Sequence, residues 1–399
     1  MSTADDTITA TEDYTARFGR AMMKSAPSPL AVMERGEGAR VWDVDGKSYL
    51  DFLAGIAVNS LGYAHPAMVR AVSEQVATLQ HVSNYFATRP QIELAERLRR
   101  VSGAGETGRV YYGNSGAEAL EAALKLARLT GRPRVLALKN AFHGRTMGSL
   151  SLTGKPALRE AFEPLIPGID HIDSTIEALE RALGPDVGAL VLEPIKGEAG
   201  VVDLPQGYLE RARELTHRHG VLLILDEVQT GAGRTGDWFA FQHHGIRPDA
   251  IAIAKGIGSG FPIGALVTFD AASDLFAMGH HGSTFGGNPL ATATANAVLE
   301  EIESADLVGN ARRRGEQLRE AVLGLGSPLI TDVSGRGLLL GIGLTEPAAP
   351  RVATAALRHG LIINAASETR IRLAPPLIIG DDEIAEFLSL FTAALEDAA

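Results

Sequence analysis

The 399-residue chain contains no cysteine, so disulfide bonds, a thiol nucleophile, an iron–sulfur cluster and a cysteine-ligated zinc site are all excluded. Basic residues are the scarcer charge, with 37 lysines and arginines against 48 acids and a formal net charge of -11. This balance argues against nucleic acid or an anionic membrane as a main partner, because both bind a basic surface. Hydrophobic residues at 45% and charged residues at 21% are ordinary values for a globular enzyme with a sizeable core.

Targeting and membrane signals are also lacking. The opening segment, MSTADDTITATEDYTARF, carries four acids before its first arginine and has no apolar core, which argues against a secretory signal and a basic transit peptide. Residues 250–269 are apolar enough to raise the question of a membrane span, but four glycines, Pro262 and Lys255 argue against one. We therefore expect a cytoplasmic protein.

Short apolar runs alternate with helical patterns between about residues 105 and 270. The expected strands are RVYY, RVLAL, GALVLEP, VLLILDE and IAIAK. Such alternation predicts a mostly parallel sheet with helices on both faces. Residues 1 to about 30 are polar and end in APSPL, so we expect an extended arm there. Residues 288–304 predict a long helix, and a final helix is expected from about residue 382.

Lys255 is the only charge between Asp249 and Asp270. A buried ammonium group without a partner is costly and tends to lose its proton. One interpretation is a lysine at a strand end that reaches out to water, as most lysines do. The other is a lysine kept partly neutral so that its nitrogen can attack a carbonyl. The lysine by itself does not decide between them.

A candidate phosphate site lies in YYGNSGAEALEAALKLAR, residues 111–128. A strand ends, the chain turns sharply, and a helix opens with Ser115 and Glu118 at the spacing of a capping box. Free backbone N–H groups and the helix dipole bind phosphate at such a helix start. Taken alone, a plain well-capped helix is the better interpretation.

A second candidate lies in VLLILDEVQTGAGRTG, where an apolar strand places Asp226 at its carboxyl end. Ligands of open α/β sheets bind at that end, although an aspartate after a strand also commonly caps a helix. Lys255 ends the next apolar strand. An acid, a lysine and a phosphate cradle together fit a ligand with a ring nitrogen to be kept protonated, an aldehyde and a phosphate. Pyridoxal 5'-phosphate (PLP) has all three groups.

The sequence resembles the class III, fold-type I PLP-dependent aminotransferases from about residue 28 to the C-terminus. The resemblance is carried by GIAVNSLGYAHP, NSGAEA, AFHGRTMGSLSLTG, EPIKGEAGV, LDEVQTGAGRTG, KGIGSGFPIGA, HGSTFGGNPLA and RLAPPLII, in that order. It implies an α/β fold with a large, mostly parallel mixed sheet between helices and a smaller α+β domain. The implied division is an N-terminal arm with part of the small domain (1–65), a large PLP-binding domain (66–300) and a C-terminal small domain (301–399). It also implies a homodimer with shared active sites.

The resemblance further implies a role for each cofactor residue. Lys255 would hold PLP as a Schiff base and move a proton during transamination, Asp226 would pair with the ring nitrogen, and Gln229 would lie near the ring hydroxyl. The other residues implied at the cofactor are Ser115, Gly116 and Ala117 at the phosphate, Phe142 stacked on the ring, and Thr284, which would reach the phosphate of the partner subunit.

Two arginines are implied at the substrate. Arg145 would bind the carboxylate remote from the reacting amine, and Arg372 would bind the α-carboxylate of glutamate. Glu198 would be the alternative partner of Arg372 when that carboxylate is absent, and Ser283 would lie beside the substrate. Arginine suits this work because its planar guanidinium binds a carboxylate through two parallel hydrogen bonds.

No metal site is expected. Several histidines come in close pairs, but none has the spacing of a metalloprotease motif, so solvated side chains are the better interpretation. These histidines are His217, His219, His243, His244, His280 and His281.

Within the family, the sequence is most similar to members that act on N2-acetyl-L-ornithine. The implied reaction moves the δ-amino group to 2-oxoglutarate and gives N-acetyl-L-glutamate 5-semialdehyde and L-glutamate, a step of arginine biosynthesis. Succinylornithine, ornithine and 4-aminobutyrate aminotransferases share the same catalytic set and stay open. A glutamate-1-semialdehyde aminomutase, which needs no 2-oxoglutarate, is a further alternative. A catalytically silent scaffold is disfavoured by the presence of Lys255, Asp226 and Arg145.

Overall fold

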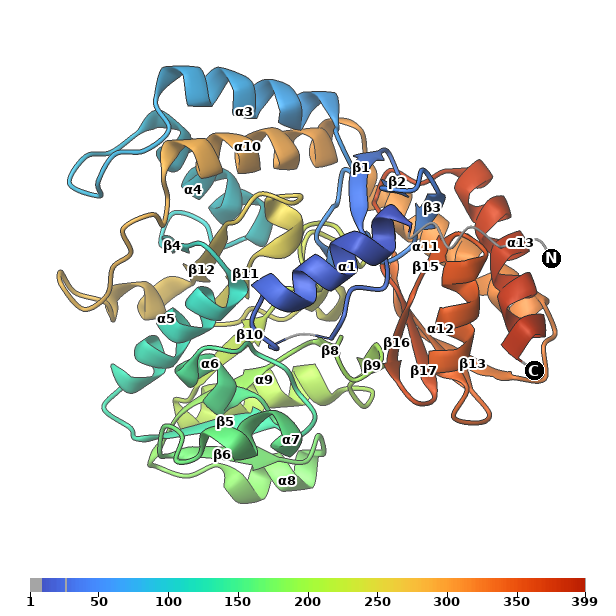
Figure 1. The fold of residues 1–399 in the computed structure, drawn as a ribbon. Helices are drawn as coiled ribbons and strands as arrows, with labels where there is room; N and C mark the ends of the chain where they lie inside the picture. The colour runs from blue at the N-terminus through green and yellow to red at the C-terminus, as the bar shows by residue number, and fades with distance from the viewer. Residues whose placement is uncertain (1–8, 26, 399) are drawn as a thin grey trace, which may run out of the picture.

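The computed structural model describes residues 9–25 and 27–398. Its centre is a seven-stranded sheet (Figure 1). In order across the sheet, the strands are β4 (Arg109–Gly113), β12 (Gly264–Thr268), β11 (Ala250–Ile253), β10 (Leu222–Asp226), β7 (Val187–Leu192), β5 (Arg134–Leu138) and β6 (Ile169–Ile172). Strand β12 is antiparallel to both of its neighbours, and every pair from β11 to β6 is parallel. The mostly parallel sheet expected from the sequence is confirmed.

Helices cover both faces of this sheet. Val191 of β7 belongs to the apolar cluster that contains helix α5 (Gly116–Arg128). The next residue, Leu192, points the other way, into the cluster that contains α9 (Tyr208–His219). A strand buried on both faces needs no polar residues, which explains the apolar runs without alternation. The other helices of this part are α2 (Ala54–Ala57), α3 (Pro66–Thr78), α4 (Arg89–Ser102), α6 (Met147–Leu152), α7 (Pro156–Arg159), α8 (Ile176–Ala182) and α10 (Pro289–Ser304).

Two smaller four-stranded sheets lie on the right of Figure 1, and the two ends of the chain meet in the first of them. One sheet has the order β1 (Met33–Glu37), β2 (Arg40–Asp43), β3 (Ser48–Asp51), β15 (Leu361–Ile362), and β3 pairs in parallel with β15. The other has the order β13 (Ile330–Arg336), β14 (Leu339–Leu344), β17 (Arg370–Leu373), β16 (Asn364–Ser367). A short pair, β8 (Ile195–Lys196) and β9 (Val202–Asp203), lies after β7. Domain boundaries at 65/66 and 300/301 stay a prediction.

Helices α11 (Leu307–Gly324), α12 (Ala349–Arg358) and α13 (Asp381–Ala398) belong to the C-terminal part of the chain. Helix α13 matches the final helix expected from about residue 382. Its predicted apolar face is buried at Ile384, Phe387, Phe391 and Leu395, and half-buried at Leu388. Phe387 stacks on Phe52, with 4.5 Å between the ring centroids, so this helix closes the core beside β3.

The expectation of an extended arm is wrong for residues 10–21, which form helix α1 (Ala10–Ala21); residues 1–8 and 26 lie outside the described residues. Thr9 Oγ1 accepts a hydrogen bond from the Glu12 N–H at 3.2 Å, and the Glu12 carboxylate accepts from the Thr9 N–H at 2.9 Å. Two further N–H groups of the first turn donate to the carboxylate of Asp45. No residue of this helix is buried, so the helix is stabilised by its caps. It therefore lacks the apolar stripe by which a helix that packs on a core is recognised in a sequence.

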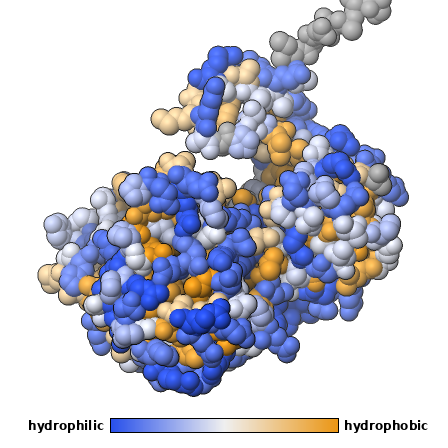
Figure 2. All heavy atoms as spheres, turned by 90° about the horizontal axis from the view of Figure 1, so that it is seen from below, coloured by the Kyte–Doolittle hydropathy of each residue, from blue (hydrophilic) through white to orange (hydrophobic). Residues whose placement is uncertain are grey.

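Hydrophilic side chains cover most of the face shown in Figure 2, with apolar side chains in patches between them. Within residues 9–25 and 27–398, no helix combines the length and the apolar character that crossing a bilayer requires. The apolar run at 250–269 is instead two strands of the central sheet, β11 and β12, with the turn between them.

Candidate active site

A cavity of about 410 Å³ lies at the carboxyl ends of the parallel strands. Its walls come from the segments that follow β4, β5, β7, β10 and β11, which is where ligands bind in open α/β sheets. The predicted site residues that line it are Ser115, Gly116, Ala117, Phe142, Arg145, Glu198, Asp226, Gln229 and Lys255. A larger cavity, of about 730 Å³, lies between the start of α9 and α11, and none of the predicted site residues lines it.

Asp226 ends β10 and is held by two partners. Its Oδ2 lies 2.7 Å from Nδ1 of His143, and its Oδ1 accepts from the Val228 N–H at 3.0 Å. Both side chains of the Asp226–His143 pair are buried. Burial by itself would lower the pKa of His143, but the hydrogen bond and charge of Asp226 outweigh it and raise that pKa. The carboxylate therefore has hydrogen-bond partners at both oxygens, as its burial requires.

Lys255 lies two residues beyond the end of β11, beside Asp226 on the neighbouring parallel strand. Its backbone φ of 47° is in the left-handed region, which residues with side chains seldom adopt and which persists mainly where surrounding contacts impose it. Burial lowers the pKa of Lys255, and the carboxylates of Glu198 and Asp226 offset only part of that effect. The lysine therefore loses its proton more readily than a surface lysine, as a nucleophile or base requires.

The start of helix α5 forms one end of the cavity. Ser115 caps the helix, because its Oγ accepts from the Glu118 N–H at 3.2 Å. The predicted capping box is altered: the Glu118 carboxylate accepts from the N–H of Asn114, one residue before the cap. Gly116 is required by space, since a Cβ there would lie 2.8 Å from the side chain of Val228. The first N–H groups of a helix have no partner within the helix, so those bordering the cavity are available to an anion.

Arg372 lies behind the cavity wall, fully buried on β17. Its guanidinium donates to the carboxylate of Glu198, to Gln229 Oε1 at 3.2 Å and to Asn364 Oδ1 at 2.8 Å. Burial by itself would raise the pKa of Glu198, but the charge and hydrogen bond of Arg372 outweigh it and lower that pKa. Glu198 is therefore ionised and neutralises Arg372.

Arg145 has a different environment from Arg372. It is exposed at the cavity mouth, with its guanidinium carbon 5.7 Å from the ring centroid of Phe142. Among the described residues it has no ion pair. A cation at the mouth of a cavity, next to an aromatic ring, can bind a substrate carboxylate without displacing an existing partner.

Ser283 and Thr284 do not line this cavity and lie in the loop before α10. Ser283 Oγ accepts from the Gly286 N–H at 3.0 Å and from the Asn114 side-chain amide at 3.3 Å. Thr284 is exposed. Their implied roles at the substrate and at the cofactor of a partner subunit stay predictions.

A sequence model of the family described as aminotransferase class-III matches residues 21–395. The chain belongs to the class-III aminotransferases. The acetylornithine aminotransferase of Streptomyces coelicolor is 50% identical to it over 390 residues, which make up 97% of this chain and 96% of that protein. The acetylornithine aminotransferase of Mycobacterium tuberculosis strain H37Rv is 50% identical over 391 residues, covering 98% of each chain.

A solved structure of ornithine aminotransferase from Toxoplasma gondii, with PLP at partial occupancy in its active site, has a TM-score of 0.91 to this class-III aminotransferase. The identity is 33%, over 98% of this chain and 96% of that one. The fold-type I architecture expected from the sequence is confirmed.

Sequence reasoning missed two buried residues of this class-III aminotransferase. His143, the partner of Asp226, directly follows Phe142 in the AFHGRT motif, but a lone histidine carries no signal of burial. Glu193 lines the cavity, and its carboxylate accepts from the N–H groups of Phe142 at 2.8 Å and Gly197 at 3.0 Å. Burial raises the pKa of Glu193 to about 7. Its signal was present: like Asp226, it is an acid at the end of an apolar strand.

Proposed function

We propose that this protein uses PLP to move the δ-amino group of N2-acetyl-L-ornithine to 2-oxoglutarate. The products are N-acetyl-L-glutamate 5-semialdehyde and L-glutamate, so the protein would act in arginine biosynthesis in the cytoplasm. The observation that carries the proposal is the placement of Lys255 and Asp226 on adjacent strand ends in one cavity with the start of helix α5. The choice of donor rests on the two acetylornithine aminotransferases that are 50% identical over nearly the whole chain.

The residues of the cavity fit PLP. The N–H groups that open α5, with Ser115 at the cap, suit a phosphate, and Asp226 supplies a buried negative charge for a protonated ring nitrogen. Phe142 borders the cavity as an aromatic surface, and Gln229 borders it as a polar one. When bound, PLP supplies an aldehyde that accepts the amino group and a ring that takes up electrons from the substrate carbon.

Lys255 would carry out the proton transfer. In its neutral form, Nζ would accept the proton from the substrate carbon that bears the amino group, and the resulting ammonium group would then give a proton back to complete the transfer. The lowered pKa of Lys255 favours this neutral form. Asp226 keeps a fixed negative charge in place, because His143 and the Val228 N–H hold both of its oxygens.

Substrate recognition would be divided between two arginines. Arg145 would bind the carboxylate of acetylornithine that is remote from the δ-amine. Glu198 neutralises Arg372 meanwhile, so the δ-amine end meets no uncompensated charge. When glutamate enters, its α-carboxylate would displace Glu198 from Arg372. One pocket would therefore serve two donors of different shape.

We expect acetylornithine to be the preferred amino donor among four candidates: acetylornithine, succinylornithine, ornithine and 4-aminobutyrate. The second ammonium of ornithine would lie near the cations of the site, whereas the acyl group of acetylornithine is neutral. Single-turnover loss of the visible absorbance of the lysine-linked cofactor gives the efficiency for each donor. Ornithine outperforming acetylornithine would refute the choice of donor. Turnover of glutamate 1-semialdehyde without 2-oxoglutarate would indicate the aminomutase.

Arg145→Ala should weaken binding of acetylornithine about tenfold. Removing one member of a buried charge pair costs roughly 2–5 kcal/mol, and the cost is smaller here because Arg145 is exposed. PLP should stay bound, since no implied phosphate or ring contact is removed. Titration of the half-reaction with acetylornithine measures the loss, and Arg145→Lys is the matched control, which keeps the charge without the planar fork. Unchanged saturation by acetylornithine in Arg145→Ala would contradict the role of Arg145.

We also propose a homodimer whose active sites are shared, with Thr284 of one subunit at the phosphate of the other. Mixing inactive Lys255→Ala subunits with inactive Thr284→Asp subunits should then restore about a quarter of normal sites, because half of the dimers are mixed and each mixed dimer has one intact site. Activity after co-refolding, together with native mass spectrometry of the mixed dimer, checks this. Mixed dimers without any activity would contradict sharing through Thr284.

A further inference from the structure

Arg370 and Arg372 lie two residues apart on β17, so their side chains leave the same face of the strand. Both guanidinium groups contact the loop between β8 and β9, which we call the switch loop (residues 197–201). Arg372 binds the carboxylate of Glu198, and Arg370 Nε donates to the carbonyl of Gly200 at 3.1 Å. The proposed function uses the first contact but gives no role to the second.

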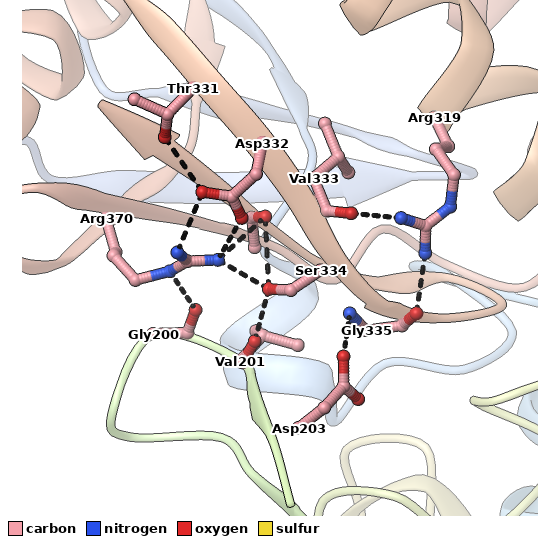
Figure 3. A network of polar contacts seen from close by, with 11 residues as sticks. Gly200, Val201, Asp203, Arg319, Thr331, Asp332, Val333, Ser334, Gly335 and Arg370 are labelled. Atoms are coloured by element: carbon pink, nitrogen blue, oxygen red, sulfur yellow. Dashed lines mark hydrogen bonds and ion pairs between the residues drawn. The ribbon is translucent and has the colours of Figure 1, made fainter. Parts of the chain in front are cut away.

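The guanidinium of Arg370 is fixed by strand β13 as well (Figure 3). It forms a two-point ion pair with Asp332, with Nη2–Oδ1 at 3.0 Å and Nη1–Oδ2 at 3.3 Å, and Nη2 also donates to Ser334 Oγ. Ser334 Oγ in turn donates to the carbonyl of Val201. The network therefore holds two consecutive carbonyls of the switch loop, those of Gly200 and Val201.

The backbone held by this network is strained. Val201 has a φ of 58°, in the left-handed region that a β-branched residue rarely adopts. Gly200 has a φ of 99°, and a Cβ there would lie 2.7 Å from Cβ of Arg370, so the arginine stem packs directly on the loop backbone. Strain of this kind persists only where the surroundings impose it. Here they do so through the Arg370 network and through the complete burial of Val201.

We propose that Arg370 is a positioning residue for the Glu198–Arg372 pair. It holds the switch loop against β17, so that only the side chain of Glu198 moves when a substrate carboxylate takes over Arg372. The inference rests on the proposed function, in which Glu198 masks Arg372 for acetylornithine and releases it for glutamate. Without this anchor, masking Arg372 must also order the loop backbone, which costs conformational entropy. The state in which Glu198 is bound to Arg372 is then less populated. The reaction with acetylornithine, which needs this state, becomes less efficient, whereas the reaction with glutamate does not.

The test uses Arg370→Met, which removes the guanidinium and keeps the stem over Gly200. In single turnovers, the ratio of acetylornithine to glutamate efficiency should fall about tenfold, mainly through saturation by acetylornithine. Arg370→Lys, which keeps a cation for Asp332, should recover much of the ratio, and Ser334→Ala should shift it in the same direction. A second measurement does not depend on catalysis: the dicarboxylate glutarate is titrated calorimetrically into the cofactor-free protein. Glutarate should bind several-fold more tightly to Arg370→Met than to the wild type, because Glu198 competes less well for Arg372 in the variant.

Arg319→Met is the matched control. Arg319 lies on α11 and donates to the carbonyls of Val333 and Gly335 on the same strand β13, and it makes no hydrogen bond to the switch loop (Figure 3). Arg319→Met therefore measures the effect of weakening the small sheet in general. It should leave the ratio of acetylornithine to glutamate efficiency near the wild-type value. The proposal is overturned if Arg370→Met lowers both donors equally, behaves as Arg319→Met does, or leaves glutarate binding unchanged. A wild-type protein that reacts with neither donor would overturn the proposed function instead, and the glutarate comparison would still decide the role of Arg370.

Discussion

Replacing Lys255 by alanine is expected to lower turnover by at least about a thousandfold and to abolish covalent attachment of PLP, because one residue would serve as both nucleophile and base. The structure gives the physical basis: the lysine follows β11, sits beside Asp226 and has a pKa lowered by burial. Borohydride reduction followed by peptide mass spectrometry should fix the cofactor on the Lys255 peptide of the wild type and nowhere in the variant. Near wild-type turnover in Lys255→Ala would refute the assignment.

Lys196 is the matched control for this experiment. Burial lowers its pKa too, but its ammonium donates to the Lys139 carbonyl at 2.7 Å and to Ser174 Oγ at 2.6 Å, and it does not line the cavity. If a lowered pKa were sufficient, Lys196 would also be labelled. We expect Lys196→Met to keep the cofactor on Lys255 and to lose stability only, since it removes a buried hydrogen-bonding group.

The central sheet could be predicted from the sequence because its strands are buried on both faces, and burial leaves a continuous apolar run such as that of β7. Asp226 and Lys255 could be placed at one edge because they end two such runs, and carboxyl ends of parallel strands lie together. Helix α1 could not be predicted in this way, since it buries nothing and depends on Asp45, a residue distant in the chain.

The hydrogen-bond partners within the site could not be predicted from the sequence, because they too depend on contacts between distant residues. A hydrogen bond between His143 and Asp226, or between Arg370 and the carbonyl of Gly200, joins residues far apart in the sequence and has no periodicity. The strained φ of Val201 is likewise a product of the tertiary contacts around it. The pairing of Glu198 with Arg372 was reached only through the resemblance to the family, not from either residue by itself.

Replacing Asp226 by asparagine is expected to lower turnover by between about a hundredfold and several thousandfold, the cost of removing one charge from a buried pair. Asparagine keeps the shape and can still accept from the Val228 N–H, but it has no charge to hold a proton on the ring nitrogen of PLP. Cofactor attachment at Lys255 should persist, so single-turnover rates with glutamate isolate the effect. Wild-type rates in this variant would show that the charge of Asp226 is not needed for the reaction.

The same variant gives a readout that needs no cofactor, through His143. In the wild type, burial would lower the pKa of His143, but Asp226 outweighs it and raises that pKa. A raised pKa contributes stability that is fully present below the unfolded value of about 6.5 and is lost as pH rises through the folded pKa. In Asp226→Asn the hydrogen bond to a charged carboxylate is lost, and among the remaining groups the charge of Glu193 raises the pKa of His143 while that of Lys196 lowers it. We expect burial to dominate, so protonation of His143 opposes folding and the variant loses stability as pH falls through about 6.5.

The gap in melting temperature between wild type and Asp226→Asn should therefore widen from about pH 8 to about pH 6. His143 Nε2 has no partner among the described residues, so Asp226 is the contact that sets this titration. In a His143→Asn background the gap should widen less over the same range. The change that remains comes from Glu193 and Glu227, whose pKa values of about 7 are raised partly by the charge of Asp226. A gap that widens equally in that background would assign the pH dependence to another group and would separate His143 from the charge of Asp226.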